Sequence, residues 1–186
     1  MNPATLISGF VPLVLFTFLD GRFPVADAAA VAAAAAIIVA VIARRGVPVL
    51  PIVQAVTLAV IAVLAFTTDA ATRTFLATYG SAIASLALAA FMLTTAPFAP
   101  FTASIARAGV PRELWTSARF LSLNRRISAV WGAAVLVLGL THLLTATVGS
   151  SLRPFQSLLL RWGPAVIVVI LAVRYTKRTI AEARHE

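Results

Sequence analysis

The chain has 186 residues, of which 61% are hydrophobic and only 11% are charged, and its mean hydropathy is +0.99. A soluble domain needs more polar surface than this, so the sequence predicts a single all-α domain over residues 1–186, a polytopic membrane helix bundle. The absence of cysteine from the sequence excludes disulfides and thiolate metal sites, and with two histidines we expect no bound metal and no cofactor. In a membrane protein the net charge of +9 indicates anionic headgroups as partners rather than nucleic acid.

Six apolar stretches, each of about 17–25 residues, predict six transmembrane helices. They cover residues 4–20, 25–43, 48–66, 74–96, 127–148 and 157–175. No Lys or Arg precedes the first stretch, so we expect a retained helix rather than a signal peptide. The second is rich in alanine and weakly hydrophobic, and we expect it inside the bundle. Arg161 interrupts the sixth, and whether that stretch spans fully stays open.

Basic residues divide unequally between the two ends of these predicted helices. If both termini lie on one side, that side holds most of the 15 Lys and Arg residues: Arg44, Arg45, Arg107, Arg112, Arg119, Arg125, Arg126, Arg174, Lys177, Arg178 and Arg184. Cytoplasmic loops carry such an excess. We therefore expect cytoplasmic termini, and the bias toward Arg and Ala favours the inner membrane of a bacterium.

Two heptapeptides are nearly identical, IARRGVP at 42–48 and IARAGVP at 105–111. Their flanks differ, because an apolar span follows the first copy and an Arg-rich segment follows the second. We interpret both as helix-end signals rather than as a duplicated unit. Gly46 and Gly109 are expected to adopt the left-handed conformation that commonly ends a helix, before a proline opens the next one.

The segment 111–126, PRELWTSARFLSLNRR, is too polar to span a membrane. Arg112, Arg119 and Arg126 recur every seven residues and line one edge of a helix, with Trp115 near its apolar face. This pattern is typical of an amphipathic helix in the membrane interface that binds anionic lipid or a protein partner. The alternative is a connector that only keeps this loop in the cytoplasm.

Ionisable residues close to a membrane indicate candidate functional sites. Asp20 and Asp27 flank the first outer turn, and His142 lies in the outer half of the fifth predicted helix. Together they are candidates for an outward-facing pocket with acid–base or proton-relay chemistry. Alternatively, both carboxylates mark helix ends and pair with Arg22, while His142 bonds a backbone carbonyl or water.

Two amides complete the set of candidate polar residues within the membrane. Gln54 lies in the third predicted helix, with Thr57 on the same face, and both are expected to form hydrogen bonds between helices. Asn124 lies at the end of the polar segment 111–126. Gly132 and Gly139 are expected where helices approach closely.

Two stretches of the chain resemble the intracellular septation protein A-like family of small bacterial inner-membrane proteins. One is GFVPLVLFTFLD near the N-terminus. The other is FLSLNRRISAVWG, which contains Phe120, Asn124, Arg125, Trp131 and Gly132. The resemblance implies a role in envelope maintenance or division through partner proteins, and it implies no catalytic residues.

Three functions remain open on the sequence alone. The first is a non-enzymatic inner-membrane protein of envelope maintenance or division that acts through lipid or partner contacts of segment 111–126, with a protein partner or a homo-oligomer both open. The second is a small-solute transporter or channel with a path near Gln54, Asp20, Asp27 and His142. The third is a membrane enzyme on a lipid or isoprenoid, such as a terpene cyclase, with Asp20 or Asp27 as the acid.

Overall fold

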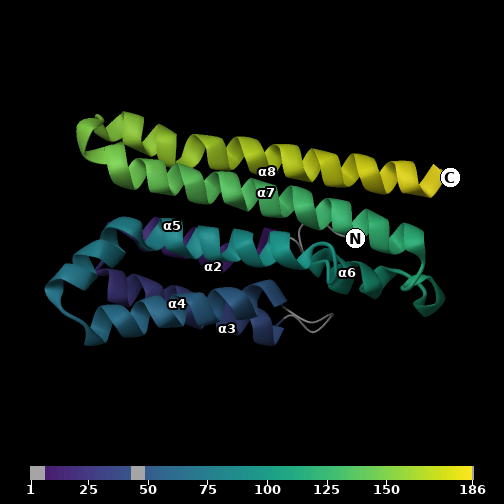
Figure 1. Ribbon diagram of the computed structural model, residues 1–186, viewed down its shortest axis with the longest axis horizontal. Coiled ribbons are helices and arrows are strands. Elements are labelled where there is room, and N and C mark those ends of the chain that lie inside the picture. The colour runs from purple at the N-terminus through teal and green to yellow at the C-terminus, as the bar shows by residue number, and fades with distance from the viewer. Residues whose placement is uncertain (1–6, 43–48, 186) are drawn as a thin grey trace.

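The computed structural model of the protein describes residues 7–42 and 49–185, which form a long bundle of helices joined by short turns (Figure 1). The helices along the bundle axis are α2 (Val11–Leu19), α3 (Val25–Ile42), α4 (Val49–Thr67), α5 (Ala70–Thr95), α7 (Ala118–Val148) and α8 (Pro154–His185). The short helix α6 (Phe101–Ala106) and the 3₁₀ turns η1 (Arg107–Gly109) and η2 (Arg112–Leu114) connect α5 to α7. A third 3₁₀ turn, η3 (Gly149–Ser151), connects α7 to α8.

Five helices in the described part of the chain are long and apolar enough to cross a membrane: Val25–Ile42, Val49–Thr67, Ala70–Thr95, Ala118–Val148 and Phe155–Ala183. The all-α bundle and its multi-pass composition are therefore confirmed. The count of six spans is not, because α2 has nine residues and the predicted first helix begins outside the described residues. The stretch with Arg161 is long enough to cross, since α8 contains all of residues 157–175 and continues to His185.

Glycines bring α5 and α7 into close contact at the centre of the bundle. A Cβ atom at Gly139 would lie 2.7 Å from Leu86 Cδ2 and 3.1 Å from the Leu86 backbone nitrogen. A Cβ at Gly132 would lie 2.9 Å from Leu93 Cδ2. The expectation of close helix packing at both glycines is confirmed, and the main core forms between these two helices and their neighbours.

The alanine-rich α3 differs from its expected position inside the bundle. It pairs with α4 along one edge of the molecule (Figure 1). Its alanines, such as Ala29 and Ala32, are buried against α4, whereas Val31, Ile38 and Val41 are exposed. The small side chains let one face of α3 pack closely against α4. The opposite face is not covered, and α3 therefore lies at the periphery of the bundle.

The segment 111–126 is not one amphipathic helix, contrary to the prediction. It begins with the turn η2, and α7 starts at Ala118, nine residues before the predicted helix. Ser117 caps α7, because its Oγ accepts a hydrogen bond of 3.2 Å from the Phe120 N–H. The N-cap therefore separates Arg112 and Trp115 from Arg119 and Arg126, which belong to the long helix.

The second heptapeptide ends a helix without a left-handed glycine. Among the described residues only Gly21 has a positive φ, of 81°. Gly109 closes the turn η1 instead, with Val110 extended after it and Pro111 preceding η2. The first copy lies in residues 42–48, of which 43–48 fall outside the described residues.

Candidate functional site

A polar cluster joins three helices at the end of the bundle that carries the turns after α2, α4 and α7. Asp20 follows α2 directly and is 4% exposed. Its Oδ2 accepts a hydrogen bond of 2.5 Å from Ser81 Oγ of α5 and forms an ion pair of 3.2 Å with Arg161 Nη2 of α8. The left-handed Gly21 turns the chain immediately after Asp20, which keeps the carboxylate facing α5 and α8.

His142 of α7 adjoins this cluster through the backbone of Ser81. Its Nδ1 lies 3.3 Å from the Ser81 carbonyl oxygen and 3.1 Å from Ser85 Oγ. Ser85 Oγ in turn donates to the Ser81 carbonyl at 2.8 Å. One turn of α5 therefore contacts both candidate residues, with the Ser81 hydroxyl at Asp20 and its carbonyl at His142.

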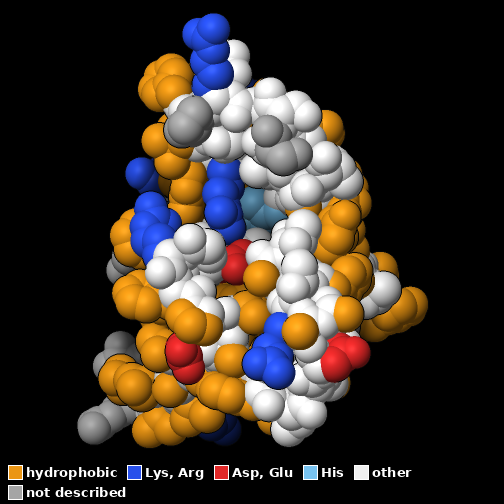
Figure 2. All heavy atoms as spheres, turned by 90° about the vertical axis from the view of Figure 1, so that its left-hand side faces the viewer, with side chains coloured by type: hydrophobic (Ala, Val, Ile, Leu, Met, Phe, Trp, Pro, Cys, Tyr) orange, Lys and Arg blue, Asp and Glu red, His pale blue; other side chains and the backbone are white. Residues whose placement is uncertain are grey.

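Figure 2 views the molecule from this end and shows a hollow in which a Lys or Arg side chain, an acidic side chain and a histidine come together. Arg161 is 26% exposed, whereas Asp20 and His142 are each 4% exposed. Arg161 therefore forms the accessible rim of the cluster, and the carboxylate and imidazole lie beneath it.

A cavity of about 490 Å³ extends from His142 into the bundle between α2, α7 and α8. Phe10 and Trp131 line it where α2 begins, and their rings stack with centroids 5.3 Å apart. Thr17, His142 and Trp162 line it toward the polar cluster. The remaining wall is aliphatic or aromatic and includes Val11, Val14, Phe18, Val135, Leu138, Val168 and Val169.

Two residues in the wall of this cavity, Thr17 and His142, each have one buried side-chain atom without a hydrogen-bond partner. Within the described ranges, three buried side-chain atoms form no hydrogen bond: Thr17 Oγ1, Asp20 Oδ1 and His142 Nε2. Thr17 and His142 line the cavity, and Asp20 lies one helical turn beyond Thr17. Buried polar groups are normally paired, so this concentration at one end of an apolar cavity marks a candidate binding site.

The structure does not bring Asp27 to this site. Its side chain is exposed on α3 and lines a separate hollow with Arg73 and Thr74. Arg22 does not pair with Asp20 as considered above. It donates to the Phe18 carbonyl at 2.5 Å and stacks over the Phe18 ring, 4.2 Å from its centroid.

The two candidate amides have structural partners. Gln54 of α4 bonds the backbone of the neighbouring chain segment, since its Nε2 donates to Gly9 O at 2.7 Å and its Oε1 accepts from Leu13 N at 2.9 Å. The expected interhelical bonding is confirmed for Gln54 and is wrong for Thr57, which donates to Val53 O of its own helix. Asn124 is buried, and its Nδ2 donates to Phe120 O one turn back in α7.

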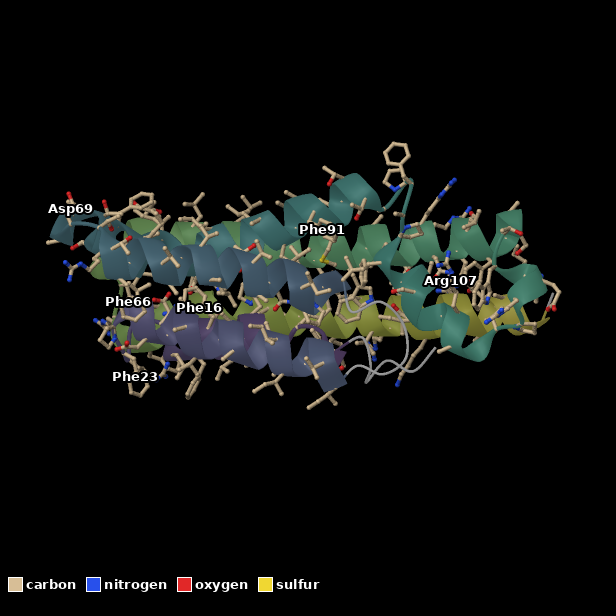
Figure 3. The ribbon with its side chains drawn as sticks, turned by 90° about the horizontal axis from the view of Figure 1, so that it is seen from below. Phe16, Phe23, Phe66, Asp69, Phe91 and Arg107 are labelled. Atoms are coloured by element: carbon tan, nitrogen blue, oxygen red, sulfur yellow. The ribbon has the colours of Figure 1, made fainter. Side chains whose placement is uncertain are left out.

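The arginines of the predicted interfacial segment lie at the opposite end of the molecule. Figure 3 labels Asp69 and Arg107 toward opposite ends of the bundle. Trp115 donates to Val110 O at 2.9 Å and has Arg107 and Arg112 within 6 Å of its ring, at 5.4 and 5.8 Å. Arg119 donates to Ala183 O at 3.0 Å, which joins α7 to α8.

No family model, no curated protein and no solved structure matches this chain. Within residues 7–42 and 49–185, no three His, Asp or Glu side chains lie close enough together to hold a metal ion. The site therefore has to be interpreted from its own geometry. Its class is a helix bundle of multi-pass composition with a polar cluster at the end of an apolar cavity.

Sequence reasoning missed Ser81, Ser85 and Thr17 as residues of this site. Serine and threonine are common in membrane helices, where they bond carbonyls of their own helix, so their spacing carried no signal. Arg161 did carry one, because an arginine within an apolar stretch needs a polar partner. Sequence reasoning treated Arg161 only as an interruption of the sixth apolar stretch, and its partner Asp20 lies 141 positions away in the chain.

Proposed function

We propose that the protein is a bacterial inner-membrane protein of envelope maintenance or division that binds an amphiphile of the membrane. The hydrocarbon part of the ligand occupies the cavity between α2, α7 and α8, and its polar end lies at Thr17 and His142. The observation that carries this proposal is the cavity itself, because its apolar wall ends at Thr17 and His142, each of which has one buried polar atom without a hydrogen-bond partner. Ligand pockets commonly combine these two features.

The placement of the cavity supports access from the membrane. Val11, Val14 and Phe18 line the cavity, and each is about half exposed, so the cavity opens at the surface of α2. In a membrane these positions meet acyl chains, so an amphiphile reaches the cavity laterally. The volume of about 490 Å³ falls within the range of roughly 300–1,000 Å³ that is common for small-molecule pockets.

The distribution of charge supports the proposed orientation. Arg107, Arg112, Arg119 and Arg126 belong to the end of the bundle that also carries the last turn of α8. An excess of basic residues is typical of the cytoplasmic side, which favours an outer position for the polar cluster. Anionic headgroups are the expected contacts of the basic end.

The geometry favours ligand binding over solute transport. Gln54, one of the residues considered for a transport path, uses both ends of its amide to hold the backbone of residues 9 and 13. The Phe10–Trp131 stack lines the inner end of the cavity. An enzyme acting on a lipid or isoprenoid would use the same cavity, with Asp20 rather than Asp27 beside it.

Native mass spectrometry of the protein released from its own membranes into mild detergent tests the proposal. We expect one retained amphiphile per chain in the wild type. Ala165→Phe fills the cavity wall and should abolish retention, whereas Val166→Phe, at the next residue and exposed outside the cavity, should not. Equal retention by the two variants, or no retained amphiphile in the wild type, would overturn the proposal.

A further inference from the structure

We propose that a separate lipid site lies in a groove between α7 and α8 and that it binds an anionic phospholipid, with the lipid phosphate at Arg174 and Arg178. The groove has a volume of about 560 Å³ and is lined by residues of α7 and α8. It differs from the cavity of the proposed function, which also has α2 in its wall. The inference therefore goes beyond the proposed function and does not depend on it.

The lining of the groove is divided into an apolar and a basic part. Small and aliphatic side chains such as Ala133 of α7 and Leu171 of α8 form the apolar part. Arg174, Tyr175 and Arg178 of α8 form the remainder. A phospholipid matches this division, because its acyl chain packs on the apolar part while its phosphate meets the arginines.

The basic part of the groove lies at the basic end of the bundle. The helices α7 and α8 lie side by side (Figure 1), and Trp131 Nε1 of α7 donates to Thr176 Oγ1 of α8 at 3.0 Å. Closer to this end, Arg119 donates to Ala183 O. Arg178 follows Thr176 by two residues and therefore lies beside the Arg-rich first turns of α7. In a membrane, basic clusters at the end of a span meet the lipid headgroups.

The length of the groove matches one leaflet of a bilayer. The lining on α8 extends from Val168 to Arg178, and ten residues at 1.5 Å each rise by about 15 Å. The hydrocarbon core of a bilayer is roughly 30 Å thick, so each leaflet contributes about half of that thickness. An acyl chain whose headgroup lies at Arg178 can therefore follow the groove to the middle of the membrane.

Both arginines are exposed and able to bind a phosphate. Within the described ranges, Arg174 forms no hydrogen bond or ion pair with the protein. Arg178 donates from Nε to Glu182 at 2.8 Å, in an ion pair whose side chains are 83% and 60% exposed, so its Nη groups remain able to donate. Residues four apart on a helix have Cβ atoms about 5–6 Å apart, so both guanidinium groups can reach one phosphate. The hydroxyl of Tyr175 is a further donor beside them.

The charge of the groove favours an anionic lipid over other ligands that carry a phosphate. No carboxylate among the described residues lines the groove, whereas two arginines do. A zwitterionic phospholipid brings a cation next to its phosphate, which the arginines repel. A phosphate without acyl chains leaves the apolar part of the groove uncovered.

Lipid titration into delipidated protein in detergent tests the proposal, with binding measured by native mass spectrometry. The probes are dioleoyl phosphatidylglycerol, dioleoyl phosphatidylcholine and glycerol phosphate, which lacks acyl chains. We expect phosphatidylglycerol to bind about fivefold or more tightly than phosphatidylcholine, and glycerol phosphate to bind more weakly than either. Equal binding of the two lipids, or tightest binding of glycerol phosphate, would overturn the proposal.

Three variants test the position of the lipid. Arg174→Gln removes an exposed charge, so it should leave the unfolding midpoint unchanged and weaken phosphatidylglycerol binding by about fivefold. Arg125→Gln is the matched control, because Arg125 is an exposed arginine at the same end of the bundle that does not line the groove. Ala133→Phe fills the apolar part and should weaken binding without a change in charge. Equal weakening by the two arginine variants, or unchanged binding by Ala133→Phe, would contradict a site in the groove.

The groove and the cavity are distinguished through residues that line only one of them, because Ala134 and Val168 line both. Ala165→Phe fills the cavity and should leave phosphatidylglycerol binding unchanged, whereas a loss would show that this lipid enters the cavity. A benzophenone amino acid at Leu171 should capture anionic phospholipids in the native membrane out of proportion to their abundance, and capture in proportion to abundance would overturn the proposal. If the wild type retains no amphiphile but binds phosphatidylglycerol as expected, the proposed function is wrong and the groove site stands.

Discussion

Arg161 of α8 and Asp20 at the end of α2 form an ion pair of 3.2 Å between residues 141 positions apart in the chain. Ser81 of α5 joins both, since its Oγ donates to Asp20 and accepts from Arg161 at 3.3 Å. This cluster links the end of α2 to α8, and both helices border the cavity. It therefore stabilises the wall of the proposed binding site without filling it.

The ion pair between Asp20 and Arg161 should make the effects of substituting its two partners on stability non-additive. Arg161→Met leaves the Asp20 carboxylate buried with Ser81 as its remaining side-chain donor, and we expect a loss of about 1–3 kcal/mol in unfolding free energy, reduced by the partial exposure of Arg161. The double variant Asp20→Asn/Arg161→Met should lose less than the sum of the two single variants. Chemical unfolding in detergent measures each free energy, and strict additivity would contradict a direct interaction.

Gln54→Leu should act on stability by releasing α2. The substitution leaves Gly9 O and Leu13 N without their side-chain partner, which we expect to lower the unfolding free energy by about 2 kcal/mol. Thr57→Val, on the same helix, removes a hydroxyl that bonds only its own helix and should change stability by less than about 1 kcal/mol. Equal effects on the unfolding midpoint would show that Gln54 does not hold α2.

Asp69 should make stability depend on acidic pH. It caps α5, where its carboxylate accepts the Thr72 N–H at 2.9 Å, and these hydrogen bonds hold the pKa of Asp69 below its usual range. The stabilisation is therefore complete above the ordinary aspartate pKa and is lost as pH falls through the lowered value. Asp69→Asn keeps an acceptor without this titration.

Thermal unfolding midpoints between neutral pH and pH 3 compare the two proteins. The wild type should lose stability relative to Asp69→Asn toward the acidic end of this range. If the unfolding midpoints of the two proteins changed with pH in parallel, protonation of Asp69 would not be lowering the stability of the wild type in this range.

The number of membrane passages can be measured directly, because the native chain has no cysteine. Phe98→Cys reports the connection between α5 and α7, and Ser151→Cys reports the turn between α7 and α8. With six passages, tags at both termini and Phe98→Cys should be inaccessible to an impermeant reagent in intact cells, whereas Ser151→Cys should react. Termini on opposite sides would instead establish an odd number of passages.

The helices were predictable because a membrane requires long apolar stretches and excludes most other structure. Boundaries were predictable only where the apolar stretch and the helix coincide. The predicted start of α7 was wrong because a helix can include polar sequence as far as its N-cap. Here the N-cap is Ser117, which precedes the Arg-rich first turns of α7. The predicted position of α3 inside the bundle was wrong because the low hydrophobicity of a helix does not indicate how many of its faces other helices cover.

The site was predictable in part. Asp20 and His142 stood out because ionisable groups are rare in such a chain, and both contact Ser81. The exclusion of Asp27 was not predictable, because it depends on which side of the turn between α2 and α3 each carboxylate faces. The cavity could not be predicted from the sequence either. It is formed between α2, α7 and α8, and no local pattern of residues indicates how these helices are spaced.

Photo-crosslinking in the native membrane tests the central claim most directly. A benzophenone amino acid replaces Val168, which lines the cavity, or Val166, which is exposed outside it, and mass spectrometry identifies the captured lipid. We predict that position 168 captures one amphiphile out of proportion to its abundance, while position 166 captures bulk phospholipids. The same bulk phospholipids at both positions would contradict a ligand-binding cavity.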